Sequence, residues 1–307
     1  MKKRQLGQSD FYVSEIGLGC MSLGTDAAKA RSIIDLAVSH GINYLDTADL
    51  YDYGMNEKIV GKAIKGKRDK VFIATKGGNR FEPGQEGWHW DASKSYLKEA
   101  FKNSLLRLGL DDVDLYQLHG GTIEDPIDDV IDLFEELKQE GLIRHYGISS
   151  IRPNVIHTFL KQSDLTAIMM QYSLIDRRPE EFLDMIHDDG ASVLVRGALG
   201  KGMLTNFGQS QWEKKGQKGF LNYDGDELKK LITDLEQLAS EIGVSLQALA
   251  IGYTLQHRAV GSLILGASNE NQLIENLKAY EQLANIPNET YETIKTITKE
   301  NIYDQHR

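Results

Sequence analysis

The stretch DPIDDVIDLFEELKQEG, residues 125–141, shows most clearly how the chain is built. Asp125 and Pro126 predict the start of a helix, because an aspartate caps helices well and proline suits the first helical position. Apolar residues then recur on one helical face: Ile127, Val130, Ile131, Phe134 and Leu137. Gly141 follows as the residue that ends the helix. The stretch therefore predicts an amphipathic helix that packs on a core.

The same unit, a helix followed by a glycine and a short apolar run, recurs along the chain. A helix from about Ala27 ends at Gly41, and another from about Arg178 ends at Gly190. Eight apolar runs predict strands: 16–18, 44–46, 71–76, 115–118, 145–149, 168–171, 192–195 and 262–265. Strands that alternate with helices form parallel sheets. We therefore expect an α/β protein with a (β/α)8 TIM barrel, as a single domain over residues 1–307.

Composition narrows the class of partner. The chain has 307 residues, a formal net charge of −10 and a pI near 5.3, which argue against an electrostatic nucleic-acid binder or a basic membrane-surface protein. A small-molecule substrate is expected instead. The single cysteine, Cys20, excludes an intramolecular disulfide, and the eight histidines lack ligand spacing, so we expect no metal site. The start of the chain has no apolar signal region, which predicts a cytoplasmic protein.

Four polar side chains follow the predicted strands at the end where barrel enzymes carry their chemistry. Asp46 closes the second strand, Tyr51 lies in the loop after it, Lys76 closes the third strand and His119 follows the fourth. A phenol has an ordinary pKa of about 10, and a buried ammonium beside it favours the phenolate. Lys76 would supply that ammonium, and Asp46 its counter-charge. Taken singly each residue has an ordinary structural role, but together they predict carbonyl reduction with Tyr51 as proton donor and His119 bound to the substrate oxygen.

Three segments closely resemble the aldo-keto reductases: GINYLDTADLY (residues 41–51), ATK (74–76) and DLYQLH (114–119). The resemblance to this family spans nearly the whole chain. The resemblance implies a TIM barrel, bound NADPH and hydride transfer from the nicotinamide to an aldehyde or ketone.

The resemblance also assigns positions to the cofactor. Near the nicotinamide it places Gly19, Cys20, Met21, Asp46, Ser149, Ser150 and Gln171, with Ser150 where asparagine is usual. Along the pyrophosphate it places Gly197, Leu199, Lys201 and Gly202. Arg196 stands where the family usually has a tyrosine that stacks on the nicotinamide. A guanidinium can stack or pair with phosphate, and a structural salt bridge is the alternative.

The last motif follows the eighth predicted strand and comprises Gly266, Ser268, Gln272, Glu275 and Asn276. Ser268 is expected to cap a helix whose N-terminus binds an anion. The motif lacks the lysine or arginine that many family members use for the adenosine 2′-phosphate, and it is similar to the branch that contains the potassium-channel β-subunits. NADPH is the predicted cofactor, and NADH stays open.

The loop after Lys76 is expected to form part of the substrate pocket. Trp88 and Trp90 are expected to wall the pocket with Tyr51 and His119, although ordinary packing explains the tryptophans equally well. The irregular stretch 206–224 is a candidate lid. A regulatory protein that binds NADPH with little turnover is the alternative function, and a metal-dependent isomerase is disfavoured.

Overall fold

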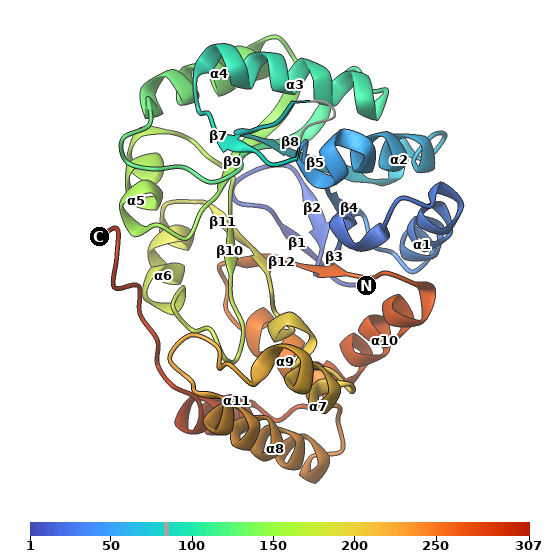
Figure 1. The fold of residues 1–307 in the computed structure, drawn as a ribbon, viewed down its shortest axis with the longest axis vertical. Helices are drawn as coiled ribbons and strands as arrows, with labels where there is room; N and C mark the ends of the chain where they lie inside the picture. Colours follow the sequence, from blue (N-terminus) through green and yellow to red (C-terminus); the bar gives the residue numbers. More distant parts are fainter. Residues whose placement is uncertain (83–85) are drawn as a thin grey trace.

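The computed structural model describes residues 1–82 and 86–307, and its centre is a closed barrel of eight parallel strands (Figure 1). In order around the barrel these are β3 (Ile16–Gly19), β4 (Tyr44–Asp46), β5 (Phe72–Gly77), β8 (Val113–Leu118), β9 (Ile143–Ser149), β10 (Ala167–Gln171), β11 (Ser192–Arg196) and β12 (Val260–Gly266). β12 pairs with β3, with Leu263 opposite Ile16, and this pairing closes the ring. The predicted (β/α)8 TIM barrel is confirmed, and each predicted strand overlaps one of these elements.

The helices surround the strands (Figure 1). They are α1 (Ala27–Ser39), α2 (Met55–Ala63), α3 (Lys94–Leu108), α4 (Ile127–Gln139), α5 (Pro153–Gln162), α6 (Glu180–Asp188), α7 (Gly208–Gln211), α8 (Gly225–Glu241), α9 (Leu246–Leu255), α10 (Glu270–Glu281) and α11 (Asn288–Ile297). In the part of the chain that the structure describes, no single helix is long and apolar enough to span a membrane. α8 and α9 meet that test only as a pair, with a bend of 92° between them.

The predicted glycine corners are present, because Gly41, Gly141 and Gly190 have φ values of 85°, 74° and 84°. This left-handed region is open to glycine without the steric cost of a Cβ atom.

Two predicted helix caps are wrong. Asp125 does not cap α4, because its carboxylate accepts hydrogen bonds from the Trp90 indole and the Thr122 amide. Asn269, rather than Ser268, caps α10 by accepting a hydrogen bond from the amide of Gln272. In both places another partner takes the side chain, so local propensity is overridden.

Two helix starts also shift. Pro126 precedes α4 instead of taking its first position. α6 begins at Glu180, two residues after the expected start at about Arg178, and Pro179 is the residue before it.

Side chains inside the barrel are arranged in layers because residues two apart on a strand face the same way. Tyr44, Ala74 and Leu115 belong to an apolar cluster inside the barrel. Two residues further along the same strands come Asp46, Lys76 and Gln117, all buried. The antiparallel hairpin of β1 (Lys3–Gln5) and β2 (Tyr12–Ser14) adds apolar residues to the cluster that contains Tyr44, Ala74 and Leu115. The polar layer therefore lies toward the carboxyl ends of the strands.

Candidate active site

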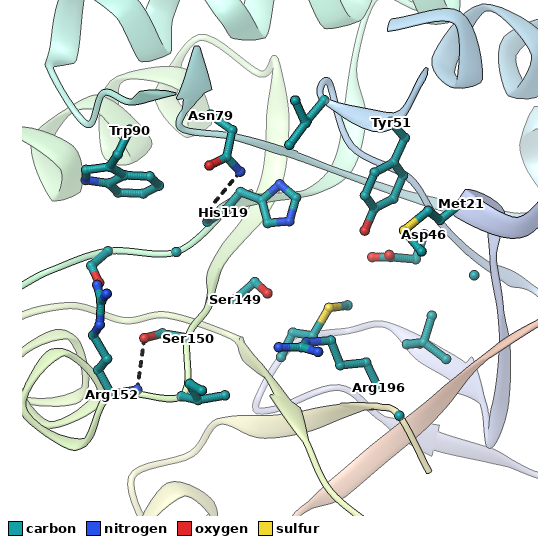
Figure 2. A pocket seen from close by; sticks show the side chains of 18 of the residues that line it. Met21, Asp46, Tyr51, Asn79, Trp90, His119, Ser149, Ser150, Arg152 and Arg196 are labelled. Carbon is teal, nitrogen blue, oxygen red and sulfur yellow. Dashed lines mark hydrogen bonds between the residues drawn. The ribbon is translucent and has the colours of Figure 1, made fainter. Parts of the chain in front are cut away.

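A cavity of about 1000 Å³ opens at the carboxyl ends of the barrel strands. Asp46, Tyr51 and His119 line it, and Figure 2 shows the hydroxyl of Tyr51 and the ring of His119 directed into the same space. Lys76 has no exposed surface and lies behind them. The fold thus brings together the four residues singled out from the sequence.

The ammonium of Lys76 is held by three oxygen atoms. It donates to Asp46 Oδ2 at 2.6 Å and to the carbonyl oxygen of Thr47 at 2.7 Å. Its third contact is the hydroxyl of Tyr51 at 3.3 Å. An ammonium has three N–H donors, so each of them has an acceptor here. The arrangement places a buried positive charge beside the phenol oxygen.

The pKa values of Asp46 and Lys76 depend on their burial and on their contact with each other. Burial raises the pKa of Asp46, and the neighbouring Lys76 ammonium opposes that rise. Burial acts to lower the pKa of Lys76, but the charges of Asp46 and Tyr51 and their hydrogen bonds raise it above its ordinary value. Lys76 therefore stays protonated at neutral pH.

His119 is a neutral imidazole at neutral pH. Burial, with smaller contributions from the charges of Lys76 and Arg196, lowers the pKa of His119 to about 3. Its ring meets that of Tyr51 edge-on, with centroids 5.9 Å apart. Its Nδ1 is buried and has no hydrogen-bond partner among the described residues. A neutral imidazole can donate one hydrogen bond, which suits binding of a carbonyl oxygen better than supply of its proton.

Gln117 and Asn79 also support the site, and the sequence reasoning missed both. Gln117 is fully buried on β8 beside Asp46, and it acts to lower the pKa of that carboxyl. Asn79 donates to the backbone carbonyl of His119 at 3.2 Å (Figure 2). Strand parity could have found Gln117, because it lies two residues before His119 and faces the barrel interior like Leu115.

Trp90 forms a fixed wall of the cavity. Its indole donates to Asp125 Oδ1 at 2.8 Å. Its ring covers Gly78 and Gly120, where an added Cβ would come within 2.8 and 2.9 Å of ring atoms. Trp88 also lines the cavity but is 56% exposed. The two glycines explain how the ring can approach the backbone so closely.

The residues expected to hold the cofactor divide into two groups. Gly19, Met21, Ser149, Ser150, Arg196, Gly197 and Gly266 line the cavity together with Asp46. In the described structure Cys20, Gln171, Leu199, Lys201, Gly202, Ser268, Gln272, Glu275 and Asn276 lie outside its lining.

Arg196 donates to Gln171 Oε1 at 3.0 Å and forms no salt bridge within the described residues. The structural salt bridge considered for it is therefore absent there, and its charge faces the cavity. Gln171 in turn donates to Asp176 Oδ2 at 3.0 Å, which orients its amide toward Arg196.

The last motif is held by internal contacts. Ser268 donates both its amide and its hydroxyl to Gln272 Oε1. Asn276 is buried and donates to the carbonyl oxygen of Gly266. A nucleotide that used Ser268 or Gln272 would exchange these bonds for its own.

The stretch 206–224 contains α7 and a short π-helix, Trp212–Gly216. Lys215 donates to the carbonyl oxygen of Lys201, so this stretch packs on the segment expected at the pyrophosphate. None of its residues lines the cavity in the described structure, whereas Tyr303 to His306 near the C-terminus do. Sequence reasoning missed this tail, as it missed Arg152 on the same wall.

The comparisons with known proteins identify the family of the chain. A family model described as "Aldo/keto reductase family" matches residues 15–299, a range that contains Asp46, Tyr51, Lys76 and His119. The chain belongs to the aldo-keto reductase family. It is therefore an oxidoreductase of a family that uses nicotinamide cofactors.

Relatives of this aldo-keto reductase cover all or most of its length. It is 53% identical to the "Uncharacterized oxidoreductase YqkF" of Bacillus subtilis, over 100% of both chains. It is 30% identical to the "NADH-specific methylglyoxal reductase" of Escherichia coli, over 91% of this chain and 93% of that one. The solved holo structure of the aldo-keto reductase AKR11C1 from Bacillus halodurans matches with a TM-score of 0.94 and 54% identity, over 100% of this chain and 99% of the other.

Proposed function

We propose that this aldo-keto reductase reduces aldehyde or ketone carbonyls to alcohols with NADPH, and that Tyr51 donates the proton. The observation that carries the proposal is the contact of the buried Lys76 ammonium with the Tyr51 hydroxyl at 3.3 Å, at the edge of the cavity. A buried positive charge at that distance stabilises the phenolate that remains after proton donation.

The cavity suits a nicotinamide dinucleotide. Gly19, Gly197 and Gly266 leave backbone exposed along one side of it, and a Cβ on Gly266 would come within 2.6 Å of Ser22 Oγ. The Arg196 guanidinium beside them suits a ligand that carries phosphate charge. Ser149 presents a hydroxyl to the same side (Figure 2). A bound reduced nicotinamide would supply the hydride.

The residues of the chain would divide the remaining work. Tyr51 would donate its hydroxyl proton to the carbonyl oxygen, and the Lys76 ammonium would stabilise the negative charge left on the Tyr51 oxygen. Asp46 would keep Lys76 charged and in place through the 2.6 Å bond. His119, neutral because burial lowers its pKa to about 3, would donate a hydrogen bond to the same carbonyl oxygen. Trp90 would exclude water from one side of the substrate.

The choice of NADPH rests on the serine, glutamine and asparagine at positions 268, 272 and 276, a pattern similar to the branch that contains the potassium-channel β-subunits. Two observations favour NADH instead: the segment 266–276 has no lysine or arginine to pair with a 2′-phosphate, and one relative is described as NADH-specific. Titration of intrinsic fluorescence with NADPH and NADH tests this choice directly. Tighter binding of NADH would contradict it and leave the carbonyl chemistry untouched.

Tyr51→Phe tests the chemistry. The variant should bind NADPH with nearly unchanged affinity and lose about 100-fold or more in single-turnover hydride transfer, since general acid catalysis typically contributes 10²- to 10⁴-fold. Tyr53→Phe is the matched control, because Tyr53 is 49% exposed and its hydroxyl contacts the amide of Gly87. Wild-type rates in Tyr51→Phe would contradict the mechanism. Tight NADPH binding without transfer to any carbonyl in the wild type would favour the regulatory alternative.

A further inference from the structure

The cavity wall carries two arginines whose charge has no carboxylate partner. Arg152 and Arg196 line the cavity, and neither forms a salt bridge within residues 1–82 and 86–307. The third arginine of the wall, Arg178, differs because both oxygens of Asp176 accept from it, at 2.7 and 2.8 Å. Figure 2 shows Arg196 on the side of Asp46 and Arg152 on the side of Trp90. The two unpaired charges thus lie in different halves of the cavity.

Arg196 belongs to the half assigned above to the cofactor, so Arg152 is the cation whose purpose is open. Its Nη1 donates to the carbonyl oxygen of Gly121, and its amide donates to Ser150 Oγ at 3.2 Å. A guanidinium has five N–H donors in a fixed fork. The bond to Gly121 fixes the position of the fork while other donors remain for a ligand. The side chain is half-buried, which limits screening of its charge by solvent.

The backbone around Arg152 adds to its positive potential. Arg152 is the residue before α5, whose first turn has no acidic residue and whose start has no side-chain cap. The amino end of a helix carries a partial positive charge. The amide of Asn154 is bonded to the carbonyl of His306, so the C-terminal tail is fastened across this end of the cavity.

No carboxylate pairs with Arg152 among the described residues, and the Asp125 carboxylate, which lies near Gly121, accepts hydrogen bonds from Trp90 and Thr122. Asp46 is balanced by Lys76 at 2.6 Å, and His119 is neutral. Asp304 is the remaining acid of the wall, and it acts on Arg178, whose pKa is raised chiefly by its hydrogen bond to Asp176 and in smaller part by Asp304. In a protein with a formal net charge of −10, the cavity wall thus carries two arginines, Arg152 and Arg196, that no described carboxylate pairs. Such charges attract anions and repel cations.

We propose that the carbonyl substrate carries an anionic group, a carboxylate or a phosphate, and that Arg152 binds this group while the carbonyl oxygen lies at Tyr51 and His119. The inference rests on the proposed carbonyl reduction and adds the class of substrate. The guanidinium of Arg152 is planar and pairs well with a carboxylate, and the Trp90 indole on the same side of the cavity packs well against a planar group. Together they favour a carboxylate on an aromatic or unsaturated frame. Arg152 would act by binding the end of the substrate that does not react.

The test compares carbonyl substrates with and without an anionic group on a similar frame. The purified enzyme is loaded with NADPH and given 3- or 4-carboxybenzaldehyde, or the methyl ester of either. Glyceraldehyde 3-phosphate against glyceraldehyde forms the phosphate arm. We expect kcat/KM to be at least tenfold higher for the better acid than for its ester. Arg152→Gln should lower kcat/KM about 10- to 100-fold for the acid, as for loss of a hydrogen bond between charged groups, and less than about twofold for the ester.

Two control variants separate charge from structure. Arg152→Lys keeps the charge without the fork and should retain part of the preference for the acid. Arg31→Gln removes an exposed guanidinium from α1, whose partner is Asp35, and should leave every kinetic constant unchanged. NADPH affinity and thermal midpoint, measured for each variant, show whether fold and cofactor site are intact.

The outcomes distinguish this inference from the proposed function. If the wild type reduces acids and esters equally well, or if Arg152→Gln lowers both equally, the anionic substrate class is wrong and carbonyl reduction stands. If the wild type reduces neither acid nor ester in single turnover, the proposed function itself fails. If only glyceraldehyde 3-phosphate is preferred over its neutral counterpart, Arg152 is still the anion site and the substrate class is phosphorylated carbonyl compounds.

Discussion

Replacing Lys76 by methionine tests the electrostatic centre of the site. The change removes the ammonium that Asp46, Thr47 and Tyr51 share, while the side chain keeps a similar length. Asp46 is 3% exposed, so its carboxylate is left buried without a counter-charge. Breaking a buried ion pair by removal of one partner typically costs about 3–5 kcal/mol. We expect a loss of that size in the free energy of unfolding at pH 8, and loss of nearly all carbonyl reduction.

The pH dependence of this loss identifies its cause. Burial already raises the pKa of Asp46, and removal of the opposing ammonium raises it further. An acid whose pKa is raised in the folded state stabilises the fold while protonated, and that stability is lost as the pH rises through the folded-state pKa. The difference between Lys76→Met and the wild type should therefore widen above the wild-type Asp46 pKa, by up to about 1.4 kcal/mol per pH unit.

Urea unfolding followed by tryptophan fluorescence at pH 5.5 and pH 8.5 measures this difference. Lys230→Met is the matched control, since Lys230 is 79% exposed and pairs with Asp234 on the surface of α8. It should cost less than about 1 kcal/mol at both pH values. The double variant Asp46→Asn/Lys76→Met should recover part of the loss. A loss for Lys76→Met that equals the control and does not change with pH would refute the reasoning.

Two further predictions concern neighbouring residues. Gly120→Ala puts a Cβ within 2.9 Å of the Trp90 ring at a φ of 134°. It should lower the free energy of unfolding by about 1–3 kcal/mol and raise KM for benzaldehyde. Gly109→Ala is the control, because Gly109 has a φ of 64° with open space around it, and this variant should leave KM unchanged. For Asp49, which is 1% exposed, burial raises the pKa from 3.8 to about 8, so its stabilising contribution is lost as the pH rises between those values. Thermal midpoints of Asp49→Asn should therefore fall less than those of the wild type between pH 5 and pH 9. Equal slopes would contradict the assignment for Asp49.

The secondary structure was largely accessible from local sequence patterns. Apolar periodicity marked the helices, and glycines such as Gly41 and Gly141 marked their ends, because a positive φ is a local property of the backbone. The cap expected at Asp125 failed because a distant partner competed for its carboxylate. Asp125 faces the Trp90 indole, 35 positions earlier in the chain, and no pattern around residue 125 contains that information.

The candidate site divides in the same way. Asp46, Tyr51, Lys76 and His119 could be named because barrel strands bring their carboxyl ends together, which follows from topology alone. Gln117 was missed although its strand parity was available. Arg152 was beyond reach, because its importance depends on which carboxylates lie near it.

The sequence by itself determined the order of strands and helices and the family, and it singled out Asp46, Tyr51, Lys76 and His119. Each of these inferences depends on local propensity, strand parity or a contiguous motif. Only the tertiary structure decided that Lys76 contacts the Tyr51 hydroxyl, that Trp90 lies on Gly78 and Gly120, and that the C-terminal tail bonds to Asn154 through His306. Packing and electrostatics act through space, and the residues they join lie far apart along the chain. The balance of charge around the cavity, and with it the expected substrate, is a property of the folded molecule.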